Sequence, residues 1–278
     1  MTGTSNYVTC LNREIHFMEW GAGNPETVVM WHGLARTGRD FDDIARELAG
    51  RYRVLCPDTI GRGLSQWSPE PDKEYGLEFY IRLAHDFVDR LGVGSMRWVG
   101  TSMGGAIGMV AAAGPLKQRI THLVLNDIGP TLAEPAVARI RTYAGAPARF
   151  ATMTELETYF RTVYQPFGSL SADQWRRLTE TSYRRTEDGM VTPHYDPQIT
   201  RQFIEHPGDY DLWPFYEAIS APTLCLRGEH SDLLLPEVAE AMTRRWPRCR
   251  LEVIAGCGHA PALNTREQIG LVRHFLEN

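Results

Sequence analysis

Short apolar runs that alternate with amphipathic segments are the feature that most limits how this chain can fold. The run "TVVMWHG" at 27–33 is continuously apolar, as expected of a strand covered on both faces. Residues 77–91 place apolar side chains at helical spacing. Strands that alternate with helices predict a mostly parallel sheet wrapped by helices on both faces. The pattern therefore predicts an α/β fold.

The same alternation continues along most of the chain. Strands are predicted at 14–20, 27–33, 52–58, 96–100, 120–127, 222–228 and 249–256. Helices are predicted at 38–49, 77–91, 103–113, 236–246 and 265–276. The first of these strands has the mixed polar and apolar pattern of an antiparallel edge.

The stretch 130–213 interrupts the alternation. It shows helical patterns at 134–143, 154–164 and 171–184, and no clear buried strand. We interpret it as a helical insertion into a core domain formed by residues 1–129 and 214–278. Its many aromatic side chains favour a mostly apolar, water-excluding pocket, although part of them are expected only to pack the insertion on the core.

Composition and charge exclude several classes of function. The net charge of -5 and the absence of a basic run argue against nucleic-acid binding. The chain has no apolar run of membrane-spanning length and no basic segment followed by an apolar stretch near residue 1, so neither a membrane span nor a signal peptide is predicted. Five scattered cysteines favour free thiols in a reducing, cytoplasmic setting.

A single serine stands between glycines in "GTSMG" at 100–104. The predicted strand ends just before Ser102 and the predicted helix begins just after it. A sharp strand-to-helix turn crowds the positions two before and two after the serine, which explains Gly100 and Gly104. Such a turn exposes the hydroxyl beside a helix N-terminus, where developing negative charge is stabilised. We therefore predict that Ser102 is a nucleophile rather than a helix cap.

A serine nucleophile needs a base and an orienting carboxylate. His259 follows the strand 249–256 and is the predicted base. Asp232 follows the preceding strand and is the favoured carboxylate, because Ser102, Asp232 and His259 then occur in the order Ser, Asp, His. Asp127, at the end of the strand 120–127, and Glu229 are the alternatives.

Acyl transfer also needs donors for an oxyanion. The N–H of Met103 is the first predicted donor, and the N–H of Leu34, in the loop after the strand 27–33, is the second. Gly33 allows that loop to turn, and His32 is expected to brace it by hydrogen bonds. No metal and no organic cofactor are required by this chemistry. Two arginines near this loop, Arg36 and Arg39, are candidates to attract an acidic substrate, but we expect them to be exposed, and exposed arginines are usually only solvated.

With these residues in place, the chain resembles the α/β-hydrolase superfamily. The resemblance rests on five motifs in order: "WHGLART", "PDTIGRGLSQ", "GTSMGG", "GEHSDLLLP" and "GCGHAP". It implies an eight-stranded, mostly parallel α/β-hydrolase sheet with a helical cap inserted after strand six, which would be 130–213. In the second motif, Asp58 is expected to hold the glycine turns by hydrogen bonds and to have no catalytic role.

The serine separates branches of that superfamily. Epoxide hydrolases and haloalkane dehalogenases need an aspartate where this chain has Ser102. The chain looks closest to capped serine hydrolases: carboxylesterases, lactonases and the hydrolases that cleave ring-fission products at a carbon–carbon bond. The last group typically carries "GNSMGG" and a tryptophan soon after the histidine, whereas this chain has Thr101 and then Ala260 and Pro261.

The leading hypothesis is therefore hydrolysis of carboxylic esters or lactones of small, mostly apolar substrates through an acyl-enzyme. Carbon–carbon hydrolysis of a vinylogous diketone is the alternative, and it would need a group such as Arg139 or Arg141 to hold a terminal carboxylate. A ligand sensor with slow turnover is the hypothesis from another class. The expected partner is a small-molecule substrate, not nucleic acid or a membrane, and the sequence leaves open whether the chain forms a homodimer.

Overall fold

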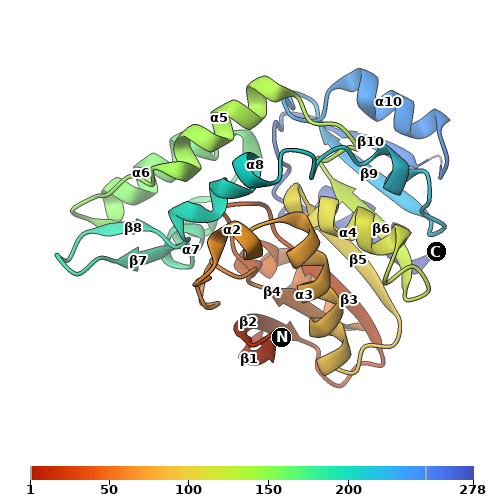
Figure 1. Ribbon diagram of the computed structural model, residues 1–278, viewed down its shortest axis with the longest axis horizontal. Helices are drawn as coiled ribbons and strands as arrows, with labels where there is room; N and C mark the ends of the chain where they lie inside the picture. Colours follow the sequence, from red (N-terminus) through yellow and green to blue (C-terminus); the bar gives the residue numbers. More distant parts are fainter. Residues whose placement is uncertain (1, 248) are drawn as a thin grey trace.

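A computed structural model describes residues 2–247 and 249–278. Its central sheet has eight strands in the order β1-β2-β4-β3-β5-β6-β9-β10 (Figure 1). Strand β2 pairs antiparallel with both of its neighbours, and the remaining pairs are parallel. The strands are β1 (Thr4–Cys10), β2 (Arg13–Trp20), β3 (Glu26–Trp31), β4 (Tyr52–Pro57), β5 (Met96–Thr101), β6 (Ile120–Asn126), β9 (Thr223–Gly228) and β10 (Arg250–Ile254). The sheet of the sequence prediction is confirmed.

Helices connect these strands. Those outside the predicted cap are α1 (Asp42–Leu48), preceded by the 3-10 helix η1 (Gly38–Phe41), then α2 (Pro71–Glu74), α3 (Leu77–Arg90), α4 (Met103–Ala113), α10 (Pro236–Arg244) and α11 (Arg266–Glu277). They match the predicted helices to within a few residues, apart from the short α2. Among the described residues, every helix is too short or too polar to cross a membrane.

Side chains of the central strands alternate between two buried clusters, one on each face of the sheet. In β3, Val29 and Trp31 belong to the cluster that includes α3 and α4, while Val28 and Met30 belong to the cluster that includes α1 and α11. All four are fully buried. Burial on both faces explains why the strand is a continuous apolar run and not an alternating one.

The edge of the sheet differs from the sequence prediction. The strand predicted at 14–20 as the edge is β2, and it lies one position inside, covered by β1. Strand β1 has mostly exposed or half-buried side chains, so it lacks the apolar pattern that marks the buried strands. A polar edge strand of this kind is stabilised mainly by its backbone pairing with β2.

Between β6 and β9 the chain leaves the sheet, as predicted, and residues 134–193 of this segment lie to one side of the sheet in Figure 1. It contains α5 (Glu134–Gly145), α6 (Met153–Val163), the 3-10 helix η2 (Gln165–Phe167), α7 (Ala172–Glu180), the 3-10 helix η3 (Pro197–Arg201), α8 (Gln202–Glu205) and α9 (Trp213–Tyr216). It also contains a hairpin of β7 (Tyr183–Arg185) and β8 (Val191–Pro193), which the helical interpretation missed. The helix predicted at 171–184 therefore ends at Glu180. The division into a core and a cap at 130–213 stays a prediction.

Candidate active site

The turn at Ser102 is strained in the way the sequence predicts. Ser102 has φ 51° and ψ -118°, between the end of β5 and the start of α4. A non-glycine residue with positive φ costs on the order of 1–3 kcal/mol, which surrounding packing must offset. A Cβ at Gly100 would collide with the backbone of Gly104, and one at Gly104 would collide with the carbonyl oxygen of Trp31. Both glycines therefore permit the close approach of α4 to the sheet.

Ser102, His259 and Asp127 form a continuous hydrogen-bonded chain. The Ser102 Oγ lies 2.9 Å from Nε2 of His259, and Nδ1 of the same ring lies 2.7 Å from Oδ2 of Asp127. The Asp127 side chain is fully buried, and the histidine side chain is 11% exposed. This geometry suits a neutral imidazole that donates to the carboxylate and accepts the serine proton.

The carboxylate at His259 differs from the one that the sequence favours. Both oxygens of Asp232 accept hydrogen bonds from the Arg139 guanidinium, at 2.8–3.1 Å, and the Asp232 side chain is 53% exposed. Glu229 is also largely exposed and accepts a backbone N–H elsewhere. The prediction for Asp232 is therefore corrected: Asp127, one of the two alternatives, contacts the histidine.

Adjacent parallel strands explain why Asp127 reaches the site. Thr101 at the end of β5 pairs with Asn126 at the end of β6, so Ser102 and Asp127 leave neighbouring strands at the same level. The Ser102 N–H donates to the Asn126 carbonyl at 3.0 Å, which ties the two turns together. Asp127 has φ 55°, which directs its chain out of the strand path.

Further hydrogen bonds fix the Asp127 carboxylate. Its Oδ1 accepts the backbone N–H of Gly228 at 2.7 Å, and its Oδ2 accepts the Ser231 hydroxyl at 2.6 Å. A buried carboxylate needs such partners because burial otherwise disfavours its charge. Ser231, which the sequence analysis did not single out, thus joins the loop after β9 to the acid on β6.

The two predicted oxyanion donors stand free beside the serine. Among residues 2–247 and 249–278, neither the N–H of Leu34 nor that of Met103 donates a hydrogen bond. A Cβ placed on Gly33 would lie 3.5 Å from the Ser102 Cβ, so the loop after β3 passes close to this serine. Unpartnered N–H groups in this position are available to an oxyanion.

A buried arginine, Arg62, contacts both residues that carry these donors. Its Nε–H donates to the Leu34 carbonyl at 2.8 Å, and its Nη2 lies 3.5 Å from the Met103 sulfur. Nη1 donates to the Ile60 carbonyl and the Tyr80 hydroxyl. The residue is 0% exposed and, within the described part of the chain, forms no ion pair. It lies in the second sequence motif, but no pattern there indicates this contact.

His32 and Asp58 hold the loops beneath the site. The His32 Nδ1–H donates to the Gly33 carbonyl at 2.7 Å, and Nε2 accepts the Thr59 N–H at 2.9 Å. Burial lowers the pKa of His32 to about 4, although the Asp58 carboxylate and the Gly33 carbonyl oppose the shift. Asp58 accepts the N–H groups of Gly38 and of residue 64, at 2.7 and 2.9 Å. The hydrogen bonds expected of Asp58 are confirmed.

A cavity of about 90 Å³ opens beside Ser102 and His259. Since one water needs roughly 10–15 Å³ on such a measure, the space suits a small molecule. Much of its wall comes from apolar side chains of the segment 130–213, namely Ile140, Tyr143, Val163, Tyr164, Phe167, Leu170 and Leu178. These residues support the expected apolar pocket without assigning a substrate.

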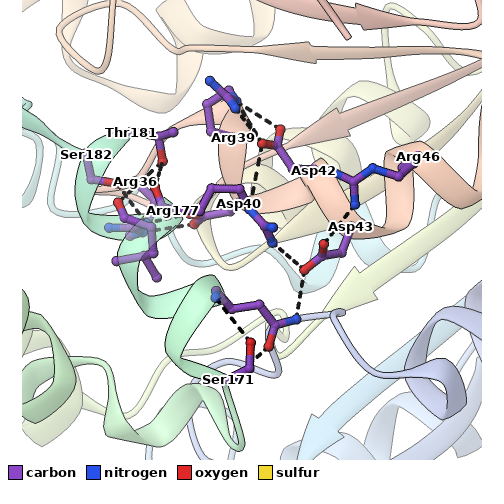
Figure 2. Close-up of polar contacts among 12 residues, drawn as sticks. Arg36, Arg39, Asp40, Asp42, Asp43, Arg46, Ser171, Arg177, Thr181 and Ser182 are labelled. Carbon is purple, nitrogen blue, oxygen red and sulfur yellow. Dashed lines mark hydrogen bonds and ion pairs between the residues drawn. The ribbon is translucent and has the colours of Figure 1, made fainter. Parts of the chain in front are cut away.

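Four arginines also line this cavity: Arg36, Arg39, Arg139 and Arg177. Figure 2 shows three of them in a network that joins residues 36–46 to the α7 region. Arg36 binds Asp40, Arg39 binds Asp42, and Arg177 binds Asp43. We call these six residues the α7 clasp.

The expectation that Arg36 is exposed is wrong. It is 5% exposed, donates to the Ser182 hydroxyl at 3.1 Å, and stacks 4.6 Å from the Tyr164 ring centroid. Arg39 is half-buried. Arg36 therefore connects the predicted core to the segment 130–213, whereas Arg39 donates its hydrogen bonds to Asp42.

The fold and the strand-to-helix turn at Ser102 are typical of one class of enzyme, and comparison with known families identifies the same class. Residues 26–264 match the model of the alpha/beta hydrolase fold family, and the chain belongs to this family. The chain is a hydrolase.

Two related hydrolases and one solved structure show which members of the family this chain is similar to. The chain is 39% identical to the 3-hydroxybutyrate-oligomer hydrolase of Cupriavidus necator, over 97% of this chain and 96% of that protein. It is 26% identical to a 2-hydroxy-6-oxononadienedioate/2-hydroxy-6-oxononatrienedioate hydrolase of Cupriavidus pinatubonensis, over 92% and 89%. An alpha/beta hydrolase structure from Novosphingobium aromaticivorans superposes with a TM-score of 0.89 at 32% identity, covering 99% of this chain and 98% of that one.

Proposed function

We propose that this chain is a serine esterase that cleaves short esters of 3-hydroxy acids. The observation that carries the proposal is the hydrogen-bonded chain Ser102–His259–Asp127 at the wall of a small cavity. Similarity to a 3-hydroxybutyrate-oligomer hydrolase over almost the whole chain supports the substrate class, because oligomers of a hydroxy acid are joined by ester bonds.

Acylation begins when His259 removes the proton of Ser102 as the Oγ attacks the ester carbonyl. The N–H groups of Leu34 and Met103 hold the oxyanion, and each is worth about 3 kcal/mol by analogy with the loss of one such donor. Asp127 stabilises the imidazolium that forms. The proton then passes from His259 to the leaving alcohol, and the acyl group stays on the serine.

Deacylation repeats these steps with water in place of the serine. His259 takes a proton from the water, the hydroxide adds to the acyl carbon, and the same two N–H groups hold the second oxyanion. The carbon–oxygen bond to Ser102 then breaks, and His259 returns the proton to its Oγ. The products are a carboxylic acid and a free alcohol, and none of these steps requires a metal or organic cofactor. Lactone hydrolysis would use the same residues.

Carbon–carbon hydrolysis is the second candidate, favoured by the similarity to the dienedioate hydrolase. The same triad and oxyanion donors would serve it. Two local departures favour ester cleavage instead: Thr101 precedes the nucleophile, and Ala260 and Pro261 follow the histidine.

The proposal is tested with a linear 3-hydroxybutyrate dimer and a vinylogous ring-fission product, assayed side by side by product chromatography. Wild-type enzyme should hydrolyse the dimer much faster, and Ser102→Ala should abolish turnover and labelling by a fluorophosphonate. Neighbouring Thr101→Ser is the control, because it keeps the hydroxyl that accepts a hydrogen bond from Asn126 at 3.0 Å. Faster cleavage of the ring-fission product would favour the second candidate, and labelling without turnover of either would favour a sensor.

A further inference from the structure

The fourth cavity arginine, Arg139, differs from the other three in its partner. The α7 clasp arginines bind carboxylates whose side chains are 2–23% exposed. Arg139 binds Asp232, whose side chain is 53% exposed. An ion pair in water contributes little net stability, so this pair exchanges its partner more easily than a buried one.

Arg139 also belongs to the cavity, whereas Asp232 does not line it. Helix α5 places Arg139 beside Ile140, and Tyr143 lies one turn further along the same face, so that all three contribute to the wall. Rotation of the Asp232 side chain into solvent would leave a guanidinium with a free bidentate face at the cavity. That face matches the geometry of a carboxylate.

The loop that carries Asp232 is fixed relative to the reacting groups. Its neighbour Ser231 donates to the Asp127 carboxylate at 2.6 Å, and Asp127 contacts His259. Asp232 is therefore held beside Arg139 by a loop that also supports the proposed triad, while Arg139 itself is placed at the cavity wall by α5. A substrate carboxylate bound there would have a defined position relative to Ser102.

We propose that Arg139 binds the free carboxylate of an acidic ester substrate and that Asp232 occupies this place until the substrate displaces it. The inference rests on the proposed esterase function and narrows it to esters whose alcohol half bears a carboxylate. The apolar wall then faces the acyl half.

Two esters of similar shape test the proposal. One is 3-butanoyloxybutanoate, and the other is 4-methylpentan-2-yl butanoate, in which an isopropyl group replaces the carboxylate. Arg139→Met should lower kcat/KM for the acidic ester by about 10- to 100-fold, the range expected for a charged bidentate contact, mainly through KM. The neutral ester should change less than about threefold. Asp232→Asn should raise kcat/KM for the acidic ester several-fold, because the competitor loses its charge.

Arg141→Met is the matched control, since Arg141 lies on the same helix, is exposed and does not line the cavity. It should leave both esters unaffected. The proposal would be overturned if the ratio of kcat/KM for the acidic ester to kcat/KM for the neutral ester were unchanged in Arg139→Met. A lowered ratio in Asp232→Asn would also overturn it.

A binding measurement separates this inference from the proposed function. In a Ser102→Ala background, calorimetry should detect binding of 3-butanoyloxybutanoate. The dissociation constant should rise about 10- to 100-fold when Arg139→Met is added. Binding of this kind by an enzyme whose wild type cleaves neither ester would retain the carboxylate site and refute the esterase. Cleavage of both esters without dependence on Arg139 would retain the esterase and refute the site.

Discussion

At the scale of single residues, Arg62 is a buried cation that the described structure satisfies with neutral groups only. Its Nε–H donates to the Leu34 carbonyl and its Nη2 contacts the Met103 sulfur, so it packs against both residues that carry the predicted oxyanion donors. In the mechanism we propose, Arg62 therefore positions the two oxyanion donors without touching the substrate.

Replacing this guanidinium should slow catalysis more than it weakens binding. We expect Arg62→Met to lower kcat for p-nitrophenyl butyrate by about 10- to 100-fold with little change in KM, because a displaced donor is felt mainly in the transition state. Arg62→Lys should recover part of the loss. Thermal unfolding checks that each variant folds, and Arg90→Met serves as an exposed control. A folded Arg62→Met enzyme with unchanged kcat would contradict this role.

His32 makes the free energy of unfolding depend on pH. Its pKa is lowered by burial to about 4 in the folded state, against about 6.5 in an unfolded chain. The unfolded state therefore binds more protons between these values, so the free energy of unfolding falls as pH falls through this window. Between pH 6.5 and pH 5, protonation of His32 in the unfolded state lowers the free energy of unfolding by about 2 kcal/mol.

Urea unfolding at pH 7 and pH 5 checks this sign. The half-buried His194, whose pKa is also lowered by burial, contributes in the same direction to both proteins compared. His32→Gln should thus lose about 2 kcal/mol less than wild type on acidification, even if it is less stable at pH 7. Equal losses in the two proteins would show that His32 is protonated in the folded state.

Asp127 and Asp232 show where residue-level prediction ended. Both preserve the order Ser, Asp, His, and both follow a strand at the same edge of the sheet. Chain order therefore did not distinguish them. The deciding fact is that β6 is the immediate neighbour of β5, which carries the serine, while Asp232 stands four residues beyond β9.

At the scale of elements, α7 is tied to α1 by polar side chains that lie far apart in the sequence. Asp43, at the start of α1, accepts hydrogen bonds from Nε2 of Gln174 at 2.9 Å and from Nη2 of Arg177 at 2.5 Å (Figure 2). The partners lie more than 130 residues apart, so no local spacing predicts them. The helix itself was predictable, because Ser171 and Gln174 form a capping box at its start.

Removing this carboxylate should loosen α7. We expect Asp43→Ala to lower the protection of backbone amides in α7 by about 1 kcal/mol, because a half-buried charged contact is lost. Hydrogen exchange with mass spectrometry measures this directly. Asp173→Ala is the control on the same helix, since its side chain is 90% exposed. A uniform change across the protein, or equal changes in both variants, would argue against a local clasp.

Short elements with weak patterns were the ones that sequence reasoning missed. The hairpin β7–β8 has three residues in each strand, too few for an alternation to be distinguished from the end of a helix. Strand β1 was not predicted because most of its side chains are exposed or half-buried, which leaves no apolar pattern in the sequence. Long buried strands and amphipathic helices were predictable because burial dictates their composition.

At the scale of the whole molecule, the fold brings together groups from four separated segments. The loop after β3 supplies Leu34, the turn after β5 supplies Ser102 and Met103, the end of β6 supplies Asp127, and the loop after β10 supplies His259. Parallel strands make this convergence possible because their carboxyl ends share one edge of the sheet. The sequence predicted the edge and the loops, and the order of strands in the sheet decided between the carboxylates.

In the mechanism we propose, Asp127 orients His259 for nucleophilic attack by Ser102. The most direct test is kcat/KM for p-nitrophenyl butyrate, a neutral ester, in Asp127→Asn and Asp232→Asn side by side. We expect Asp127→Asn to lose about 10³- to 10⁴-fold, as an amide would favour the wrong imidazole tautomer. The loss of kcat/KM in Asp232→Asn should be at least 100-fold smaller than the loss in Asp127→Asn. A greater loss in Asp232→Asn than in Asp127→Asn would contradict the account.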